Sequence, residues 1–125
     1  MRSAIRIAVA ASLLLLPVLA SAQNKALGAW DFTTVSPEGT FTSLLEIREE
    51  AGKLVAVGKS DRGERPYDSI EVDGSKITLV ITISYNGTPM TITYRGQISD
   101  PNMSGDADFG GLATGSWSAA RHKTQ

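Results

Sequence analysis

The expected fold is decided by the run YRGQISDPNMSGDADFGGLATGSWSAAR, from Tyr94 to Arg121. Large and small residues alternate there with polar ones, and turn residues divide the run into three short strands. Alternation with a period of two is typical of a sheet with one buried face. Glycine that recurs on that face indicates tight curvature or a close neighbour, so a small closed barrel is predicted. The residues expected to point inward are Tyr94, Gly96, Ile98, Met103, Gly105, Ala107, Phe109, Gly115, Trp117 and Ala119.

Five further strands precede this run. The clearest is Lys76 to Tyr85, in which four isoleucines and leucines alternate with threonine, valine and serine. Turn signals separate the strands, and Asp73-Gly74 and Asn86-Gly87 are typical of hairpins. The other strands are expected at residues 27–35, 41–49, 53–59 and 67–72, with the polar stretch from Ser60 to Pro66 as a loop.

These eight strands predict an all-β protein. Strands that follow one another with short turns pair as hairpins, so the expected architecture is a single eight-stranded antiparallel up-and-down β-barrel. A flattened two-sheet sandwich is the alternative. No stretch after residue 22 shows the 3.6-residue apolar period of a helix.

The first 22 residues predict a cleaved signal peptide. Arg2 and Arg6 form a positive start, and the apolar region from Ile7 to Leu16, ten residues long, is too short to span a bilayer as a helix. Ala20-Ser21-Ala22 fits the small-x-small pattern of a cleavage site, and an uncleaved anchor is the alternative. We therefore expect a periplasmic or secreted protein with no membrane association after cleavage.

Residues 23–125 suit one domain. Without Arg2 and Arg6, ten basic residues face thirteen acidic ones, a formal charge of −3, which argues against nucleic-acid binding. The chain has no cysteine, so thiolate metal sites and cysteine nucleophiles are excluded. We expect a monomer.

Gly28-Ala29-Trp30 near the start and Arg121 near the end resemble the calycin group, which includes lipocalin and avidin-like barrels. The resemblance implies that Gly28 lets the backbone bend, that Trp30 closes one end of the barrel, and that Arg121 stacks on the indole. The chain also resembles small β-domains of exported bacterial proteins. Those domains carry elements similar to Met103-Ser104-Gly105 and to the run from Trp117 to Arg121.

No catalytic site is expected. His122, the one histidine, lies in a polar tail and is interpreted as part of a frayed chain end. Asp106 and Asp108 share one face of a strand, but that face is opposite the buried one, so a solvated surface is favoured over a calcium pair. We predict no enzyme activity, no metal and no cofactor.

The interior leaves two functions open. Fifteen large inward side chains favour a filled barrel that acts through its loops as a protein-interaction or inhibitor module for an exported enzyme. They are Trp30, Phe32, Phe41, Leu45, Ile47, Leu54, Ile77, Leu79, Ile81, Ile83, Ile92, Tyr94, Met103, Phe109 and Trp117. Glycine and alanine on the third and the last three strands would instead leave a pocket for a small apolar molecule. The candidate ligand-binding residues are Phe32, Tyr94, Gly105, Phe109 and Trp117.

Overall fold

The computed structural model describes residues 25–123 of the 125-residue chain. Every element assigned within that range is a strand. The expected signal peptide, Met1 to Ala22, and its cleavage site lie outside the described residues. The strands are β1 (Gly28–Ser36), β2 (Gly39–Glu50), β3 (Lys53–Ser60), β4 (Gly63–Pro66), β5 (Ser69–Asp73), β6 (Lys76–Tyr85), β7 (Thr88–Ser99), β8 (Asn102–Phe109) and β9 (Ala113–Arg121).

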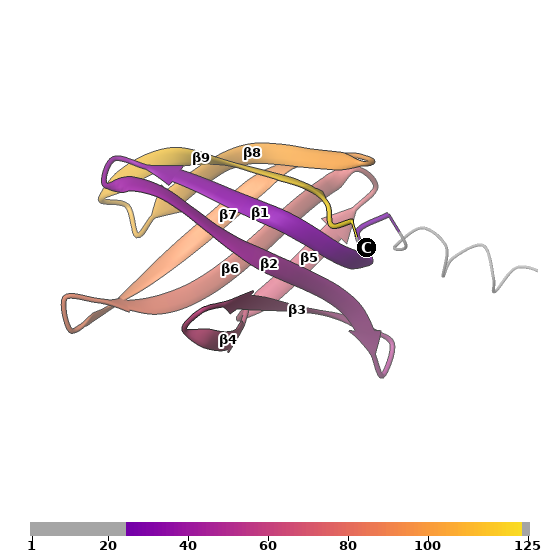
Figure 1. The fold of residues 1–125 in the computed structure, drawn as a ribbon, viewed down its shortest axis with the longest axis horizontal. Coiled ribbons are helices and arrows are strands. Elements are labelled where there is room, and N and C mark those ends of the chain that lie inside the picture. Colours follow the sequence, from indigo (N-terminus) through magenta and orange to yellow (C-terminus); the bar gives the residue numbers. More distant parts are fainter. Residues whose placement is uncertain (1–24, 124–125) are drawn as a thin grey trace, which may run out of the picture.

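The strands form one antiparallel sheet in the order β4-β3-β2-β1-β9-β8-β7-β6-β5. β1 pairs with β9, with Trp30 opposite Arg121, so the first and last strands are neighbours. Figure 1 shows the sheet curling round, and β5 at one edge of the sheet comes close to β3 near the other edge. The predicted all-β, antiparallel barrel is thereby confirmed, and the chain forms one continuous sheet, not the two sheets of a sandwich.

The strand count differs from the prediction, because part of the expected loop from Ser60 to Pro66 is strand β4. Its four residues pair with β3 from Val57↔Pro66 to Ser60↔Gly63. All four are exposed, so the apolar alternation that marks a half-buried strand is missing. The ninth strand was therefore invisible to a prediction based on hydrophobic pattern.

The barrel closes through a segment that changes partner. β4 pairs with β3, and the Tyr67 N–H still donates to the Ala56 carbonyl at 2.9 Å. One residue later, the Asp68 N–H donates to the Val80 carbonyl of β6 at 2.7 Å. β5 then pairs with β6 only as far as Val80, so residues 81–85 of β6 have a strand partner on the β7 side alone.

The inward residues form one apolar core. Of the fifteen large side chains predicted to point inward, Leu54 and Ile83 are half-buried, and Phe41 is 58% exposed. Phe41 keeps its inward register opposite Thr34, but it lies at an open end of the barrel. The expectation of a buried Phe41 is therefore wrong, because alternation gives the face of a residue and not its depth along the barrel.

Candidate functional site: a pocket at the open end of the barrel

One end of the barrel is closed by Trp30 and Arg121. The indole of Trp30 is fully buried, and its Nε1–H donates to the Ala26 carbonyl at 2.9 Å. The Arg121 guanidinium carbon lies 4.0 Å from the centroid of the indole ring, a cation–π distance. Trp30 therefore fills this end, and Arg121 covers it.

The arginine is held by chain segments from both sides. Its Nε lies 3.1 Å from Asp100 Oδ1, its Nη2 donates to the Lys25 carbonyl at 2.9 Å, and its Nη1 donates to the Leu27 carbonyl. Gly28 has a φ of 121°, which side chains rarely adopt, and a Cβ there would come within 2.7 Å of Arg121 Nη1. Glycine at this position leaves room for the guanidinium.

Next along the barrel axis comes an aromatic layer. Phe32 and Trp117 stack with ring centroids 5.2 Å apart and an interplanar angle of 19°. Tyr94 meets Phe32 edge-on at 5.1 Å and Trp117 at 6.2 Å. Phe32, Trp117 and Tyr94 are all buried, so the middle of the barrel is filled by side chains.

Glycines on β7 and β8 leave space for that layer and not for a ligand. A Cβ on Gly96 would lie 2.7 Å from Trp117 Cζ2 and would collide with the Ser104 carbonyl oxygen. A Cβ on Gly105 would lie 2.5 Å from Gly96 Cα and would collide with the Arg95 carbonyl oxygen. The two glycines let paired strands and the indole approach closely.

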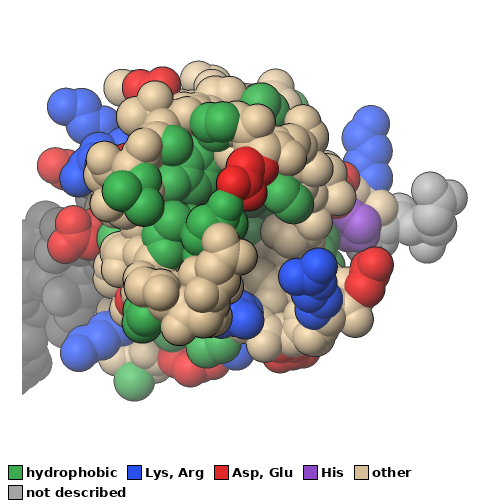
Figure 2. Space-filling view, turned by 90° about the vertical axis from the view of Figure 1, so that its left-hand side faces the viewer, with side chains coloured by type: hydrophobic (Ala, Val, Ile, Leu, Met, Phe, Trp, Pro, Cys, Tyr) green, Lys and Arg blue, Asp and Glu red, His purple; other side chains and the backbone are tan. Residues whose placement is uncertain are grey.

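The other end of the barrel is open and holds a pocket of about 610 Å³. Figure 2 looks onto this end and shows hydrophobic side chains gathered around a hollow. The turns β1–β2, β6–β7 and β8–β9 surround it (Figure 1). The lining residues are Thr34, Ser36, Pro37, Glu38, Phe41, Arg62, Tyr67, Ile81, Ile83, Ser84, Tyr85, Met90, Ile92, Tyr94, Phe109, Leu112 and Ala113.

The inward positions of β1 explain why the barrel is closed at one end and open at the other. Trp30 and Phe32 fill the closed end and the middle, whereas Thr34 and Ser36, which come next, are small. Because Thr34 and Ser36 are much smaller than an aromatic residue, space remains at this end of the barrel. A mostly apolar wall with a few polar groups is typical of small-molecule pockets.

Two tyrosines bring polar groups to the deep part of this pocket. The Tyr94 hydroxyl accepts a hydrogen bond from Thr34 Oγ1 at 3.3 Å, and both residues are buried. The ring of Tyr67 lies with its centroid 6.5 Å from that of Tyr94. Burial raises the pKa of both phenols, so Tyr67 and Tyr94 are neutral at ordinary pH.

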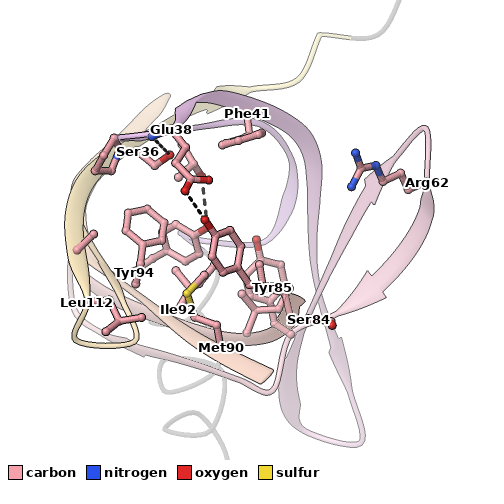
Figure 3. A pocket seen from close by; sticks show the side chains of 17 residues that line it. Ser36, Glu38, Phe41, Arg62, Ser84, Tyr85, Met90, Ile92, Tyr94 and Leu112 are labelled. Carbon is pink, nitrogen blue, oxygen red and sulfur yellow. Dashed lines mark hydrogen bonds between the residues drawn. The ribbon is translucent and has the colours of Figure 1, made fainter. Parts of the chain in front are cut away.

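A hydrogen bond crosses the mouth. The Tyr85 hydroxyl, at the end of β6, donates to a carboxylate oxygen of Glu38 in the β1–β2 turn, as Figure 3 shows. This bond raises the pKa of the Tyr85 phenol. Arg62, on the turn between β3 and β4, stands to one side of the mouth (Figure 3). The two charged residues of the lining, Glu38 and Arg62, both come from exposed turns.

The candidate ligand-binding residues fall into two groups. Tyr94 and Phe109 line the pocket, whereas Phe32, Trp117 and Gly105 lie outside its lining, in the filled middle of the barrel. Small residues on the last strands indicated a pocket there, but the Phe32–Trp117 stack occupies that space.

The sequence analysis missed several lining residues. Of the three tyrosines, only Tyr94 was predicted to point inward, yet Tyr67 packs over Gly58, where a Cβ would lie 3.4 Å from Tyr67 Cε1. A glycine at an inward position of β3 is the signal that could have indicated it. Glu38 belongs to a turn, where no period-two pattern exists, and Tyr85 is the last residue of β6, where the alternation does not show that its hydroxyl reaches the β1–β2 turn.

Two other polar residues considered from the sequence, His122 and Asp108, form hydrogen bonds within the fold. His122 is not frayed: its N–H donates to the Ala29 carbonyl at 2.9 Å, and its Nδ1 lies 2.8 Å from Asp31 Oδ1 on the exposed outer surface. Asp108 Oδ1 accepts the Gly111 N–H at 2.9 Å and stabilises the β8–β9 turn. Between residues 25 and 123, no cluster of three or more metal-ligating side chains occurs.

The same described range contains no helix long and apolar enough to cross a membrane. Comparison with known proteins yields no matching family model and no matching curated protein. Among solved structures, the chain is similar to a redesigned β-barrel, with a TM-score of 0.60 and 16% sequence identity. The match covers 82% of this chain and 96% of the other. At that identity the likeness shows the fold alone, and the fold is a β-barrel.

Proposed function

We propose that this protein is an exported, non-enzymatic β-barrel module that binds a small apolar molecule in the open half of its barrel. The observation that carries the proposal is the pocket of about 610 Å³, which lies within the range of small-molecule sites. A barrel packed from end to end would offer no such space.

The lining supports an apolar ligand. Ile81, Ile92 and Phe109 form buried apolar walls, and Ile83 and Met90 continue them toward the mouth. Removal of these surfaces from water by a ligand would be favourable at roughly 25 cal/mol per Å². Methionine adapts its shape and so suits a pocket that accepts more than one molecule.

The calycin resemblance is part of the same proposal. Trp30 and Arg121 meet in the arrangement that the resemblance implies, in which the pair closes one end of the barrel, and the loops at the mouth are where calycins usually make contacts. Export fits the expected signal peptide. The periplasm or the exterior would then be the place where the protein meets its ligand, as a monomer with no cofactor.

A protein-interaction module is the alternative, and one observation favours it. Phe41 is 58% and Leu112 is 83% exposed beside the mouth, and large apolar residues at a rim are typical of contact sites. A partner protein, such as an exported enzyme, could then contact the loops at this end.

A single pocket-filling substitution tests the proposal. Ala113 lines the pocket at the start of β9, whereas Ser116 points outward from the same strand. Ala113→Trp should abolish the fluorescence gain of the apolar probe N-phenyl-1-naphthylamine, and Ser116→Trp, the matched control, should preserve it. If the unmodified protein does not bind the probe, or if both variants bind it equally, binding in this pocket is contradicted.

A further inference from the structure

We infer that the pocket selects apolar molecules that carry a neutral hydrogen-bond acceptor, such as the carbonyl oxygen of a ketone, and that this oxygen enters first. The inference rests on the proposed function and adds the chemical class of the ligand. Tyr67 and Tyr94 would donate to the oxygen in the deep part of the pocket.

The first observation is that Tyr94 has a free donor. In the bond between Thr34 and Tyr94, the threonine hydroxyl donates and the phenol oxygen accepts, at 3.3 Å. The phenol proton of Tyr94 is therefore not used in that bond. A phenol donates one hydrogen bond and accepts others, so Tyr94 can donate to a molecule in the pocket while Thr34 holds its oxygen in place.

The second observation concerns Tyr67. No described residue hydrogen-bonds to its hydroxyl, and yet no side-chain polar atom in the described range is fully buried without a partner. The Tyr67 oxygen is therefore not fully buried, and Tyr67 is one of the residues that line the pocket. A polar group in such a place is satisfied by water or by a ligand, and an apolar ligand without an acceptor would leave it unpaired.

The third observation excludes an anionic group as the deep end of the ligand. Burial raises the pKa of the Tyr67 phenol, and the nearby Tyr94 raises it further, so both hydroxyls stay neutral donors. The charged residues of the lining, Glu38 and Arg62, both stand at the mouth. A carboxylate pushed to the deep end would lose its water without a cation to replace it.

The burial of the lining residues from the deep end to the mouth gives the expected orientation of the ligand. Thr34 and Tyr94 are buried, whereas Phe41 and Leu112 at the mouth are exposed. A ligand with its oxygen at the tyrosines would leave its hydrocarbon part against Ile81, Ile92 and Met90, and its far end at the rim. The ligand would therefore make its polar contact deep in the pocket and its apolar contacts near the mouth. A fatty acid held by a charged residue at the mouth would bind in the opposite orientation.

The experiment measures displacement of N-phenyl-1-naphthylamine by 2-undecanone, undecane and undecanoate, in the unmodified protein and in Tyr67→Phe and Tyr94→Phe. Each variant removes one hydroxyl, and a neutral hydrogen bond corresponds to roughly a 3- to 10-fold change in Kd. We expect each variant to lose affinity for the ketone by about that factor and to bind undecane at least as tightly as the unmodified protein does, because the alkane then leaves no hydroxyl unpaired at that position. Ser118→Ala, which removes an exposed hydroxyl from the outer face of β9, should change neither.

Several results would overturn the inference while leaving the proposed function intact. One is that the Tyr→Phe variants lose equal affinity for the ketone and the alkane, and another is that they lose affinity for neither. A third is that undecanoate binds more tightly than the ketone and that its binding depends on Arg62. Absence of probe binding would contradict the proposed function itself.

A second readout does not depend on the variants folding. Infrared spectroscopy of bound 2-undecanone should show its carbonyl stretch at lower frequency than in hexane, because a donated hydrogen bond weakens the C=O bond. A bound carbonyl with its frequency in hexane would contradict the inference.

Discussion

Phe32 on β1 and Trp117 on the neighbouring strand β9 stack inside the barrel, with ring centroids 5.2 Å apart, and the stack separates a filled half from an open half. On the closed side of the stack, Trp30 fills the barrel and Arg121 covers it. On the open side lie the small β1 residues Thr34 and Ser36 and the pocket. The interior is therefore neither fully packed nor hollow, and this division is the structural basis of the proposed binding.

The closed end should contribute mainly to stability. Trp30→Ala removes a fully buried indole and should lower the free energy of unfolding by about 3–5 kcal/mol. Arg121→Ala should lower it less, by about 1–2 kcal/mol, because the arginine side chain keeps contact with solvent. Chemical denaturation measures both. If the denaturation midpoint of Trp30→Ala equals that of the unmodified protein, Trp30 does not stabilise the closed end.

The inward glycines of β7 and β8 should not tolerate side chains. Gly105→Leu places atoms against the Arg95 carbonyl and Gly96 and should cost about 1–3 kcal/mol or more. Gly58→Ala is the matched control, since it is also an inward glycine but its Cβ would meet Tyr67 at an ordinary 3.4 Å. Thermal melts of the two variants should separate clearly. A stable Gly105→Leu variant would show that this part of the barrel has free space.

Much of the barrel was predictable, because its strands other than β4 alternate with period two. The alternation did not show how deep in the barrel an inward residue lies. It also did not reveal a strand whose side chains are all exposed. Phe41 has the register of an inward residue and still lies at the rim. β4 is held by backbone bonds to β3 while its side chains face solvent, so no hydrophobic pattern marks it.

The pocket was harder to locate than the fold. Small residues near Trp117 suggested space on the last strands, but Gly96 and Gly105 are small because the indole and the paired backbone fill that region. The space lies instead above Tyr94, where turn residues such as Glu38 meet Tyr85 from a distant strand. Contacts between turns far apart in sequence depend on how strongly the sheet curls, and no local pattern reports that.

Stability should fall at high pH because of Tyr67. Its folded-state pKa is raised above the unfolded value of 10.0, so the folded state favours the neutral phenol. The stabilisation is complete below pH 10 and is lost as the pH rises above it, because the unfolded chain releases the proton more readily. Denaturation series between pH 8 and about pH 12 should show this loss, and it should be smaller in Tyr67→Phe. A loss of equal size in that variant would rule out Tyr67 as the source.

The bond between Tyr85 and Glu38 should slow ligand exchange. Tyr85→Phe removes a hydrogen bond that crosses the mouth, so the dissociation rate of a bound probe should rise by roughly 3- to 10-fold. Both residues are exposed, so the melting temperature should change little. Stopped-flow displacement measures the rate. An unchanged rate would mean that the bond does not restrict the mouth.

Methyl NMR of the isoleucines and methionines during titration with N-phenyl-1-naphthylamine shows whether small apolar molecules bind in the open half of the barrel. Isoleucines occur on both sides of the aromatic layer, so the protein contains its own control. We expect shifts at Ile81, Ile83, Met90 and Ile92, which line the pocket, and none at Ile77, Ile98 and Met103, which do not. Shifts confined to the second group, or no shifts in either, would mean that the open half does not bind the probe.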